Sequence, residues 1–376
     1  MPDDGPPLDS QVRRRPRTKV SALAQFLRLI ARWRRPRLPV NIVLVVSTLA
    51  DLVLAGTAIA QPARNADSAA QDDRSDRIQA EENSIDDANS AAQERQAAPA
   101  AAPKEFYVRI NLPLFYNSNA EELQSHGSSA VEGNPQLELG WARSFTALPV
   151  KLAVKLYADV DRYANVPIPN EANEDELYES IKASYNDASD DQQWSPFVSF
   201  KNNTIYDATF NPWTETKNDF AIGFDKFFNF NGGFQRLPAS AKSRNNAVFT
   251  LGMSIYVQRR LRTPGPSSWA FYAVPSVTYV PAKEWSISLF LNTRQRWFDS
   301  VSGSTPRRDF EFEPIFTVAY DPTTPLLGAE GKSLAQFFGT PQIALQVGFE
   351  RRSSNLPNKS YSIWTAGPVL TASWKF

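Results

Sequence analysis

The chain has one histidine, His126, and a serine follows it two positions later. On a strand, His126 and Ser128 would share a face, and a histidine base beside a serine hydroxyl is an arrangement that nucleophilic catalysis uses. The residues around the pair are small and polar, which is typical of a loop that does not fix such a geometry. We therefore interpret His126 as a solvated loop residue, and we expect no catalytic residue and no enzymatic activity.

A second group that could bind a ligand is acidic. It consists of Glu171, Glu174, Asp175, Glu176, Glu179, Asp187, Asp190 and Asp191. Carboxylates are ligands that Ca²⁺ prefers, but the spacing does not match an EF-hand loop. The chain has no cysteine, which excludes disulfides and cysteine zinc sites, and it has no glycine-rich phosphate loop. We interpret the acidic group as a solvated surface loop, and we expect no metal and no cofactor.

Ten further charged residues occur on the polar faces of segments whose other face is apolar. Five are basic and five are acidic: Arg109, Glu138, Lys151, Lys155, Asp159, Arg294, Arg296, Glu311, Glu313 and Glu350. Charged groups that leave bulk water must be paired or hydrated. If the apolar faces point outward, these charges face a common interior, and two interpretations are open. The charges form a salt-bridged plug that rigidifies a narrow barrel, or they line a hydrated path with basic and acidic walls.

The segments that would position these charges alternate apolar and polar residues from Phe106 onward. Between Val150 and Leu156, for example, every second residue is valine or leucine. One apolar and one polar face over such lengths is typical of transmembrane barrel strands, whereas the strands of a soluble β-sandwich are usually shorter. We predict twelve strands, at residues 105–115, 135–146, 149–162, 176–188, 194–208, 218–230, 246–260, 269–280, 284–297, 308–320, 341–352 and 362–376.

The strand at 176–188 has the weakest alternation, and a topological argument supports it. Single-chain bacterial barrels usually have even strand numbers, with both chain ends on the periplasmic side. The tight connections at 146–149 and 281–284 are then both periplasmic only if a strand lies between residues 163 and 193.

Prolines fall inside several predicted strands. They are Pro113, Pro196, Pro275, Pro314 and Pro368. Each proline removes a hydrogen-bond donor from the ladder, and a closed barrel has no free edge to accommodate it. We therefore expect bulges or strand ends at these positions.

The last predicted strand carries an apolar or aromatic residue at every second position. Nearest its end these are Leu370, Ala372, Trp374 and Phe376. The strand resembles the C-terminal signature of Gram-negative outer-membrane β-barrel proteins, although no particular family is identified. The resemblance implies that the barrel-assembly machinery reads these residues. It also implies that the protein lies in the cell outer membrane, in contact with lipid and lipopolysaccharide.

The first 104 residues differ in composition from the rest. Residues 1–60 combine a basic flank with an apolar run that ends in Ala58-Ile59-Ala60, which is the pattern of a secretory signal peptide. An uncleaved anchor helix is the alternative, but Asp51 lies within the apolar run. Residues 61–104 are rich in Ala, Asp, Glu, Gln and Pro and predict a disordered periplasmic linker. Because the basic excess lies in the signal segment, we expect no nucleic-acid partner.

The sequence thus predicts an all-β protein, an antiparallel transmembrane β-barrel of about twelve strands at residues 105–376. We expect a narrow, porin-like channel for small polar solutes. A membrane-embedded lipid-modifying enzyme is one alternative, because His126 and Ser128 resemble part of the active site of the outer-membrane phospholipase. That family has a longer H-x-S-N-G motif, which this chain lacks. The other alternative is a structural or adhesion barrel that displays the loops 116–134 and 163–176.

Overall fold

The structure is a computed structural model. It describes residues 106–120, 127–145, 149–164, 173–185, 194–207, 210, 212–237, 248–282, 284–299, 305–322, 339 and 341–376. The predicted signal peptide at 1–60 and the predicted linker at 61–104 lie outside these residues. Within the described part of the chain, no helix has both the length and the apolar character needed to cross a membrane.

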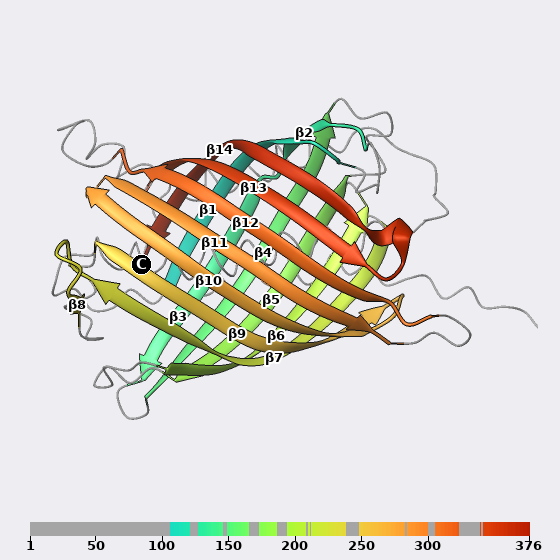
Figure 1. Ribbon diagram of the computed structural model, residues 1–376, viewed down its shortest axis with the longest axis horizontal. Coiled ribbons are helices and arrows are strands. Elements are labelled where there is room, and N and C mark those ends of the chain that lie inside the picture. Colours follow the sequence, from blue (N-terminus) through green and yellow to red (C-terminus); the bar gives the residue numbers. More distant parts are fainter. Residues whose placement is uncertain are drawn as a thin grey trace, which may run out of the picture. The chain divides into compact units, whose positions relative to one another are not determined.

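The described residues form one closed antiparallel β-sheet (Figure 1). In chain order its elements are β1 (Phe106–Asn117), β2 (Ala130–Gly133), β3 (Gln136–Phe145), β4 (Val150–Ala164), β5 (Glu174–Tyr185), β6 (Trp194–Asp207), β7 (Trp213–Phe230), β8 (Arg236–Leu237), β9 (Phe249–Thr263), β10 (Ser268–Ala282), β11 (Trp285–Phe298), β12 (Arg308–Tyr320), β13 (Gln342–Ser354), the short 3-10 helix η2 (Pro357–Lys359) and β14 (Tyr361–Lys375). The long strands pair in chain order, and β14 pairs with β1 to close the barrel. At this closure the amide of Phe376 donates a hydrogen bond of 2.8 Å to the carbonyl oxygen of Phe106.

Twelve strands make up the wall, because β2 and β3 are one strand with a two-residue interruption. The register against β1 is the same on both sides of the interruption: Leu114 pairs with Gly133, and Asn111 pairs with Gln136. The short β8 pairs only with β7. The predicted number of strands is therefore confirmed, and the weakly patterned strand predicted at 176–188 is present as β5.

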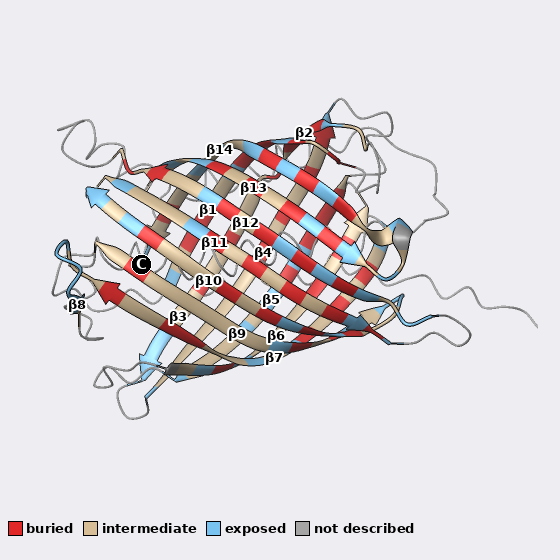
Figure 2. Cartoon of the chain, viewed as in Figure 1, coloured by how far each residue is buried: buried red, intermediate tan, exposed pale blue. Residues whose placement is uncertain are grey.

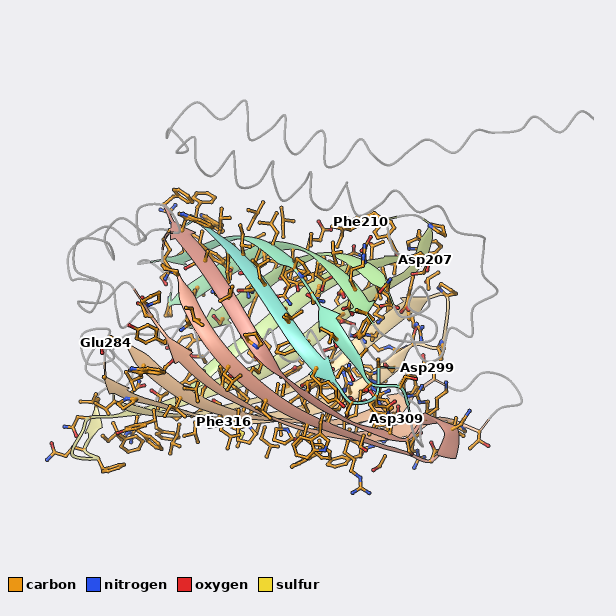
Figure 3. All side chains as sticks on the ribbon, turned by 90° about the horizontal axis from the view of Figure 1, so that it is seen from above. Asp207, Phe210, Glu284, Asp299, Asp309 and Phe316 are labelled. Atoms are coloured by element: carbon orange, nitrogen blue, oxygen red, sulfur yellow. The ribbon has the colours of Figure 1, made fainter. Side chains whose placement is uncertain are left out.

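The two ends of the barrel differ in their connections. We call the end at which Phe106 and Phe376 meet the terminus end, and the opposite end the far end. The connections at 146–149 and 281–284 both lie at the terminus end, as the strand count predicted. Figure 3 shows Glu284 at this end, with Asp299 and Asp309 at the other. The longest connections between strands, 231–248 and 321–341, also lie at the terminus end.

The far-end connections are shorter than the sequence suggested. Both ends of the predicted display loop 116–134 include strand residues, because β1 continues to Asn117 and β2 covers Ala130–Gly133. The predicted loop 163–176 likewise loses residues to β4 and β5. The strands at this end therefore reach further than the apolar alternation alone indicates.

The outer face of the barrel is apolar and the inner face is polar, which is the reverse of a soluble protein. Buried and exposed residues alternate along the strands (Figure 2). Exposed large apolar side chains include Leu112, Val198, Ile222, Leu289, Phe316, Leu345, Trp364 and Leu370, which are 41–64% exposed. Leaving such a side chain in water rather than burying it costs about 1.5–3 kcal/mol. This surface is therefore suited to hydrocarbon, and the alternation that the sequence shows separates a lipid-facing wall from a polar interior.

The prediction of bulges at the strand prolines is wrong at four of five positions. Only Pro196 lies near a strand end, beyond the last pair that β6 forms with β5. At Pro113, Pro275, Pro314 and Pro368, the pairing with one of the two neighbouring strands is interrupted for two residues. It then continues in the same register. A missing donor costs about one ladder hydrogen bond, whereas a one-residue slip would turn the inward charges toward lipid.

The lapse beside Pro275 shows how the barrel limits this loss. The β10–β11 ladder is interrupted between the pairs Ala273–Thr293 and Ser276–Phe290. Within the interruption, the Thr293 hydroxyl donates a hydrogen bond of 2.6 Å to the carbonyl oxygen of Ala273. A side chain therefore satisfies an acceptor that borders the gap.

Candidate functional site

The inner wall is the candidate functional site, because it collects the charged side chains of the barrel. All ten predicted charges occupy inward positions of the alternating strands. Eight of them are buried: Arg109, Glu138, Asp159, Arg294, Arg296, Glu311, Glu313 and Glu350. The other two, Lys151 and Lys155, are half-buried. The structure brings these residues together in separate groups rather than in one cluster.

One group lies on β1, β3 and β4. Arg109 and Glu138 are register partners, and Arg109 Nη1 lies 3.8 Å from Glu138 Oε1. Lys155 Nζ lies 3.9 Å from the other oxygen of Glu138. These distances are near the limit for an ion pair, and Lys155 retains 23% exposure of its side chain. Glu138 therefore forms weak ion pairs with both Arg109 and Lys155, and water still reaches Lys155.

A second and tighter group lies on β11, β12 and β13. Glu311 pairs with Arg294 on one side and, at 3.1 Å, with Nε of Arg352 on the other. Arg352 also lies 3.8 Å from Glu350, which accepts a hydrogen bond of 2.7 Å from the Tyr361 hydroxyl. The side chains of these charged residues are at most 5% exposed. This network ties three adjacent strands together in the far half of the barrel.

A third group on β7 and β9 was not singled out from the sequence. Arg260 donates two hydrogen bonds of 2.7 Å to the two oxygens of Asp219. Arg262 Nε lies 2.6 Å from Glu215 Oε1, and Lys217 Nζ lies 3.8 Å from the same oxygen. The signal was available, since all five residues follow the alternation of their strands. Glu215, Lys217 and Arg262 were missed because the predicted strand began at residue 218 and the next one ended at 260. Asp219 and Arg260 lie inside those predicted strands and were overlooked.

A fourth group consists of acidic side chains on β2, β4 and β5, which we call the acidic wall. Its members are Glu132, Asp159, Asp161, Glu174 and Glu176, each at most 6% exposed. Neutral donors hold three of them: Asn117 Nδ2 donates to Glu132 at 2.9 Å, Tyr157 to Asp159 at 3.2 Å and Tyr163 to Asp161 at 3.4 Å. In the far half of β2 to β5, no inward position among the described residues is basic.

A basic wall stands across the lumen from the acidic wall. It consists of Arg260 and Arg262 on β9 and Arg294 and Arg296 on β11. In the closed order of twelve strands, five strands separate β4 from β11 in either direction, so the two walls face each other. Arg294 also donates a hydrogen bond of 3.3 Å to the hydroxyl of Tyr272, on the strand between the two pairs. Three of these arginines, Arg260, Arg262 and Arg294, are ion-paired with carboxylates on the neighbouring strands β7 and β12.

The terminus half of the lumen has a different lining. Many of its described inward positions are Ala, Ser or Gly, and those that are half-buried or exposed include Ala142, Ser144, Ala153, Ser180, Ser199, Ala221, Gly223, Gly252, Ser254, Ser276, Ser286 and Ser288. Others, such as Phe197 and Asp225, are larger and buried. In a single-walled barrel, an inward side chain that remains accessible borders open space. We call these accessible inward positions of the terminus half the vestibule, and the far half contains the packed, charged groups described above.

The other candidate residues do not assemble into a site. His126 lies outside the described residues, as do Glu171, Asp187, Asp190 and Asp191. Interpreting the acidic group as a solvated loop is wrong for three of its members, because Glu174, Asp175 and Glu176 are buried strand residues. Asp175 is bound by Arg162 at 2.7 Å. Among the described residues, no three acidic or histidine side chains are placed to hold a metal ion together.

The four C-terminal signature residues lie on the lipid-facing side of β14 or directly after it. Leu370 is 48% exposed, and Ala372, Trp374 and Phe376 are half-buried. The apolar alternation of the last strand is thus part of the outer surface of the closed barrel. Recognition of these residues by an assembly machinery stays a prediction.

A closed antiparallel barrel with an apolar outer face and a polar interior is the architecture that bacterial outer membranes use, because closure leaves no unpaired backbone edge in lipid. This chain is an outer-membrane β-barrel. No protein-family model matches its sequence, and no curated protein matches it either.

Several solved structures are similar to the barrel at low sequence identity. The outer-membrane channel COG4313 from Pseudomonas putida F1 is 10% identical, with a TM-score of 0.45 over 74% of this chain and 100% of the channel. LpxR from Salmonella typhimurium is 9% identical, with a TM-score of 0.37 over 71% of this chain and 99% of LpxR. The KdgM porin is 7% identical, with a TM-score of 0.32 over 71% of this chain and 99% of the porin. These similarities assign no activity to the barrel.

Proposed function

We propose that the barrel is a narrow, porin-like channel that passes small polar solutes across the outer membrane. The observation that carries the proposal is the lining of the lumen. Small, accessible side chains border the terminus half, and this vestibule leads into a far half with opposed acidic and basic walls. In this proposal the salt-bridged charges narrow the far half of the pore, and the vestibule forms its wider part.

The physical basis is the free energy that a polar solute loses when it leaves water and enters a narrow pore in a low-dielectric membrane. A solute that loses part of its water must exchange it for polar groups of the protein, and charged rings supply such groups in narrow pores. Barrels of about eight strands are filled by side chains, whereas those of sixteen or more leave an open channel. With twelve strands, the identity of the inward residues decides between these limits, and here it differs along the axis.

The opposed walls also predict which solutes pass. A transverse field aligns dipolar molecules, so that zwitterions and small sugars with ordered hydroxyl groups cross with less loss of hydration than apolar molecules. Glu174 and Glu176 on β5 represent the acidic wall, and both face inward. Glu179 lies on the outer side of the same strand and is exposed.

The test is conductance of the purified full chain in planar lipid bilayers under a KCl gradient. We expect discrete, salt-dependent current steps. The double variant Glu174→Gln/Glu176→Gln should shift the reversal potential toward anion selectivity, because it removes two carboxylates from the lumen. Glu179→Gln is the matched control and should leave the reversal potential unchanged. An electrically silent wild-type protein contradicts the proposal, and so does a double variant with unaltered selectivity.

The same preparations separate the alternative functions. Release of fatty acid or a modified lipid by the reconstituted protein would support the membrane-embedded enzyme. Specific retention of cells or matrix by a silent barrel would support the adhesion protein. Among the described residues, no arrangement of side chains favours either alternative over the channel.

A further inference from the structure

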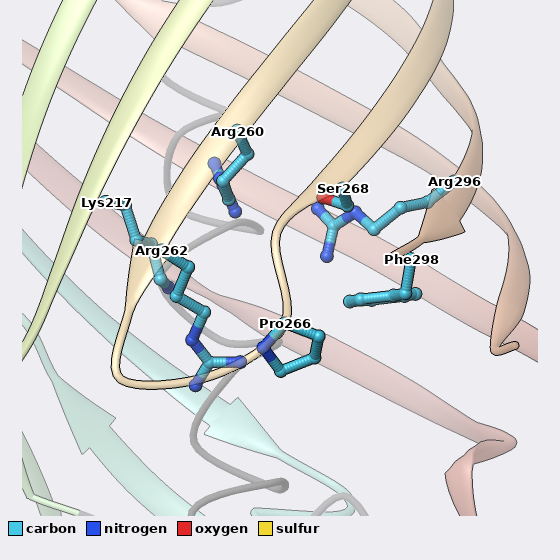
Figure 4. A pocket seen from close by; sticks show the side chains of 7 residues that line it. All are labelled: Lys217, Arg260, Arg262, Pro266, Ser268, Arg296 and Phe298. Atoms are coloured by element: carbon cyan, nitrogen blue, oxygen red, sulfur yellow. The ribbon is translucent and has the colours of Figure 1, made fainter. Parts of the chain in front are cut away.

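The inner and outer walls of the far half hold their arginines in different settings. On the inner wall, a small cavity beside the turn between β9 and β10 is lined by four basic residues together with Ser268 and two apolar residues (Figure 4). Asp219 binds Arg260 and Glu215 binds Arg262, so these bases belong to the ion-paired groups described above. The outer wall of the same end has a different arrangement.

Two outward arginines at the far end, Arg308 on β12 and Arg351 on β13, are exposed. Within the part of the chain that the structure describes, neither guanidinium group has a carboxylate partner, and no outward position of β12, β13 or β14 is acidic. On β9, by contrast, the outward Arg259 binds Asp299 at 2.6 Å. The outer surface of β12 to β14 is therefore basic at the far end.

The outward residues of β13 show where this part of the wall leaves the hydrocarbon. From the terminus end toward the far end they are Ile343, Leu345, Val347, Phe349, Arg351 and Ser353. An arginine on the lipid face is costly at the middle of a bilayer and nearly neutral at its interface. Arg351 therefore marks the boundary between the acyl chains and the headgroups.

Two exposed hydroxyl groups flank Arg351. Ser362 on β14 is its register partner, and Ser353 follows it on the same face of β13. Partners in an antiparallel pair lie about 4.5–5.5 Å apart, and residues two apart on one strand lie about 7 Å apart. Neither hydroxyl is hydrogen-bonded to another described residue. A guanidinium group with two hydroxyls at this spacing can donate hydrogen bonds to the oxygens of one phosphate group.

Aromatic side chains lie beside this polar group. The rings of Phe349 and Trp364 pack with their centroids 4.6 Å apart, and Trp364 is 57% exposed. Phe312 is the register partner of Arg351 on β12, and it is also exposed. A ligand that matches both parts of this surface has a phosphate group joined to acyl chains.

The rim that carries the second arginine is held in place by Asn355. The Arg308 amide donates a hydrogen bond of 2.7 Å to the Asn355 side chain, and the Asn355 amide donates one of 3.1 Å to the carbonyl oxygen of Arg308. Arg308 lies four residues beyond Phe312 on the same face of β12. It is therefore nearer the rim than Arg351, at the level of the outer part of a headgroup.

We propose that Arg351, Ser353 and Ser362 form a binding site for a phosphate group of lipopolysaccharide, with Arg308 as a second cation nearer the rim. Both chain ends of a bacterial barrel usually face the periplasm, so the far end lies in the outer leaflet, whose lipid is this phosphorylated glycolipid. The aromatic side chains contact its acyl chains. The site lies on the outside of the barrel and does not depend on the channel function proposed above.

The test is native mass spectrometry of the detergent-solubilised full chain, titrated with lipid A, which is the phosphorylated membrane anchor of lipopolysaccharide. Dephosphorylated lipid A with the same acyl chains is the second probe. We expect the dephosphorylated lipid to bind about tenfold more weakly or worse, because it loses the charge-assisted hydrogen bonds to Arg351. Equal affinities would mean that the wall binds acyl chains alone, which overturns the proposal.

Variants of the arginines locate the site. Arg351→Gln should weaken the binding of phosphorylated lipid A by about tenfold or more and leave the affinity for the dephosphorylated lipid unchanged. Arg351→Lys should retain part of the affinity, and Arg308→Gln should cause a smaller loss. Arg143→Gln is the matched control, because Arg143 is an exposed outward arginine near the terminus end of β3. Equal losses in Arg351→Gln and Arg143→Gln, or no loss in either, contradict the site.

The two proposals fail in different ways. A silent barrel whose lipid A binding depends on Arg351 retains the lipid site and contradicts the channel. A barrel that conducts but binds both forms of lipid A equally retains the channel and contradicts the lipid site.

Discussion

The two halves of the lumen are built by the same twelve strands and differ only in what faces inward. In the terminus half many inward residues are small and accessible, as at Ala153 and Ser254, whereas in the far half many are charged and buried, as at Arg352. Alternation decides which face is inward in both halves. The volume and charge of the inward side chains then decide how densely each half is packed, so the two halves of one β-barrel have different linings.

The two halves should also differ in how much the removal of one charge lowers the free energy of unfolding. The largest expected effect is that of Glu311→Gln, because this carboxylate pairs with both Arg294 and Arg352 at no more than 5% exposure. Removing one partner of a buried ion pair costs about 3–5 kcal/mol, since an uncompensated charge stays behind. Urea unfolding of the detergent-solubilised barrel, followed by tryptophan fluorescence, measures the loss.

Lys155→Gln is the corresponding change in the terminus half. Its pair with Glu138 is 3.9 Å long and partly exposed, so the cost should stay below about 1 kcal/mol. If Lys155→Gln destabilised the barrel as much as Glu311→Gln, the terminus half would not be hydrated and the comparison would fail.

The turns at the two ends give the next largest contrast. Gly265, between β9 and β10, has a φ of +116°, and a Cβ there would lie 2.9 Å from Nε of Arg262. Gly265→Ala should therefore cost about 1–2 kcal/mol in urea unfolding, through backbone strain and displacement of Arg262. Gly232, in a terminus-end loop, has only an ordinary contact at its Cβ position, with Val248 Cγ2 at 4.0 Å. Gly232→Ala should be nearly neutral, and equal losses at the two glycines would contradict this account.

Narrowing the vestibule should affect transport more than stability. Ala153→Phe places an aromatic ring at an accessible inward position of β4. We expect single-channel conductance to fall by about half or more, because the hydrated path becomes narrower, while the melting temperature stays close to that of the wild type. Unchanged conductance would show that solutes do not pass this level of the lumen.

The smallest expected effect concerns the outer rim of the far end. Arg259 donates two hydrogen bonds, of 2.8 and 2.6 Å, to Asp299, and these hold the pKa of Asp299 below its usual value. A carboxyl group with a lowered folded-state pKa adds stability that is present above its unfolded pKa of about 3.9 and is lost as the pH falls through the folded value. Because the pair is exposed, the contribution is at most about 1 kcal/mol.

This contribution can be isolated with Asp299→Asn. The variant should melt slightly below the wild type at pH 7, and the difference should disappear as the medium is made strongly acidic. A difference that persists at low pH would mean that Asp299 acts through something other than its charge.

Much of the wall could be predicted from the sequence, because alternate residues of each strand face lipid and the polar interior, which produces a period of two. The same periodicity placed all ten of the proposed inward charges on the inner face. It underestimated the strand ends, where polar residues occupy both faces, and for that reason Glu215, Lys217 and Arg262 were missed. The missed strand β2 has a related cause, since Asn134 and Pro135 look like a turn and yet only interrupt a ladder.

The ion pairs could not be predicted in the same way. Whether Glu311 contacts Arg294, Arg352 or both depends on the register of three strands, and alternation within one strand does not contain that information. The cavity beside Ser268 is likewise a product of register, because its basic residues come from β7, β9 and β11.

The interruptions beside the prolines have a mechanical consequence. Strand β1 has missing rungs on both of its sides, opposite β14 near Pro368 and opposite the β2–β3 strand near Pro113. A membrane exerts lateral pressure on the barrel from all sides. Under such pressure the barrel wall bends first where the fewest hydrogen bonds link its strands. We therefore expect the cross-section of the barrel to change from round to oval most easily along β1.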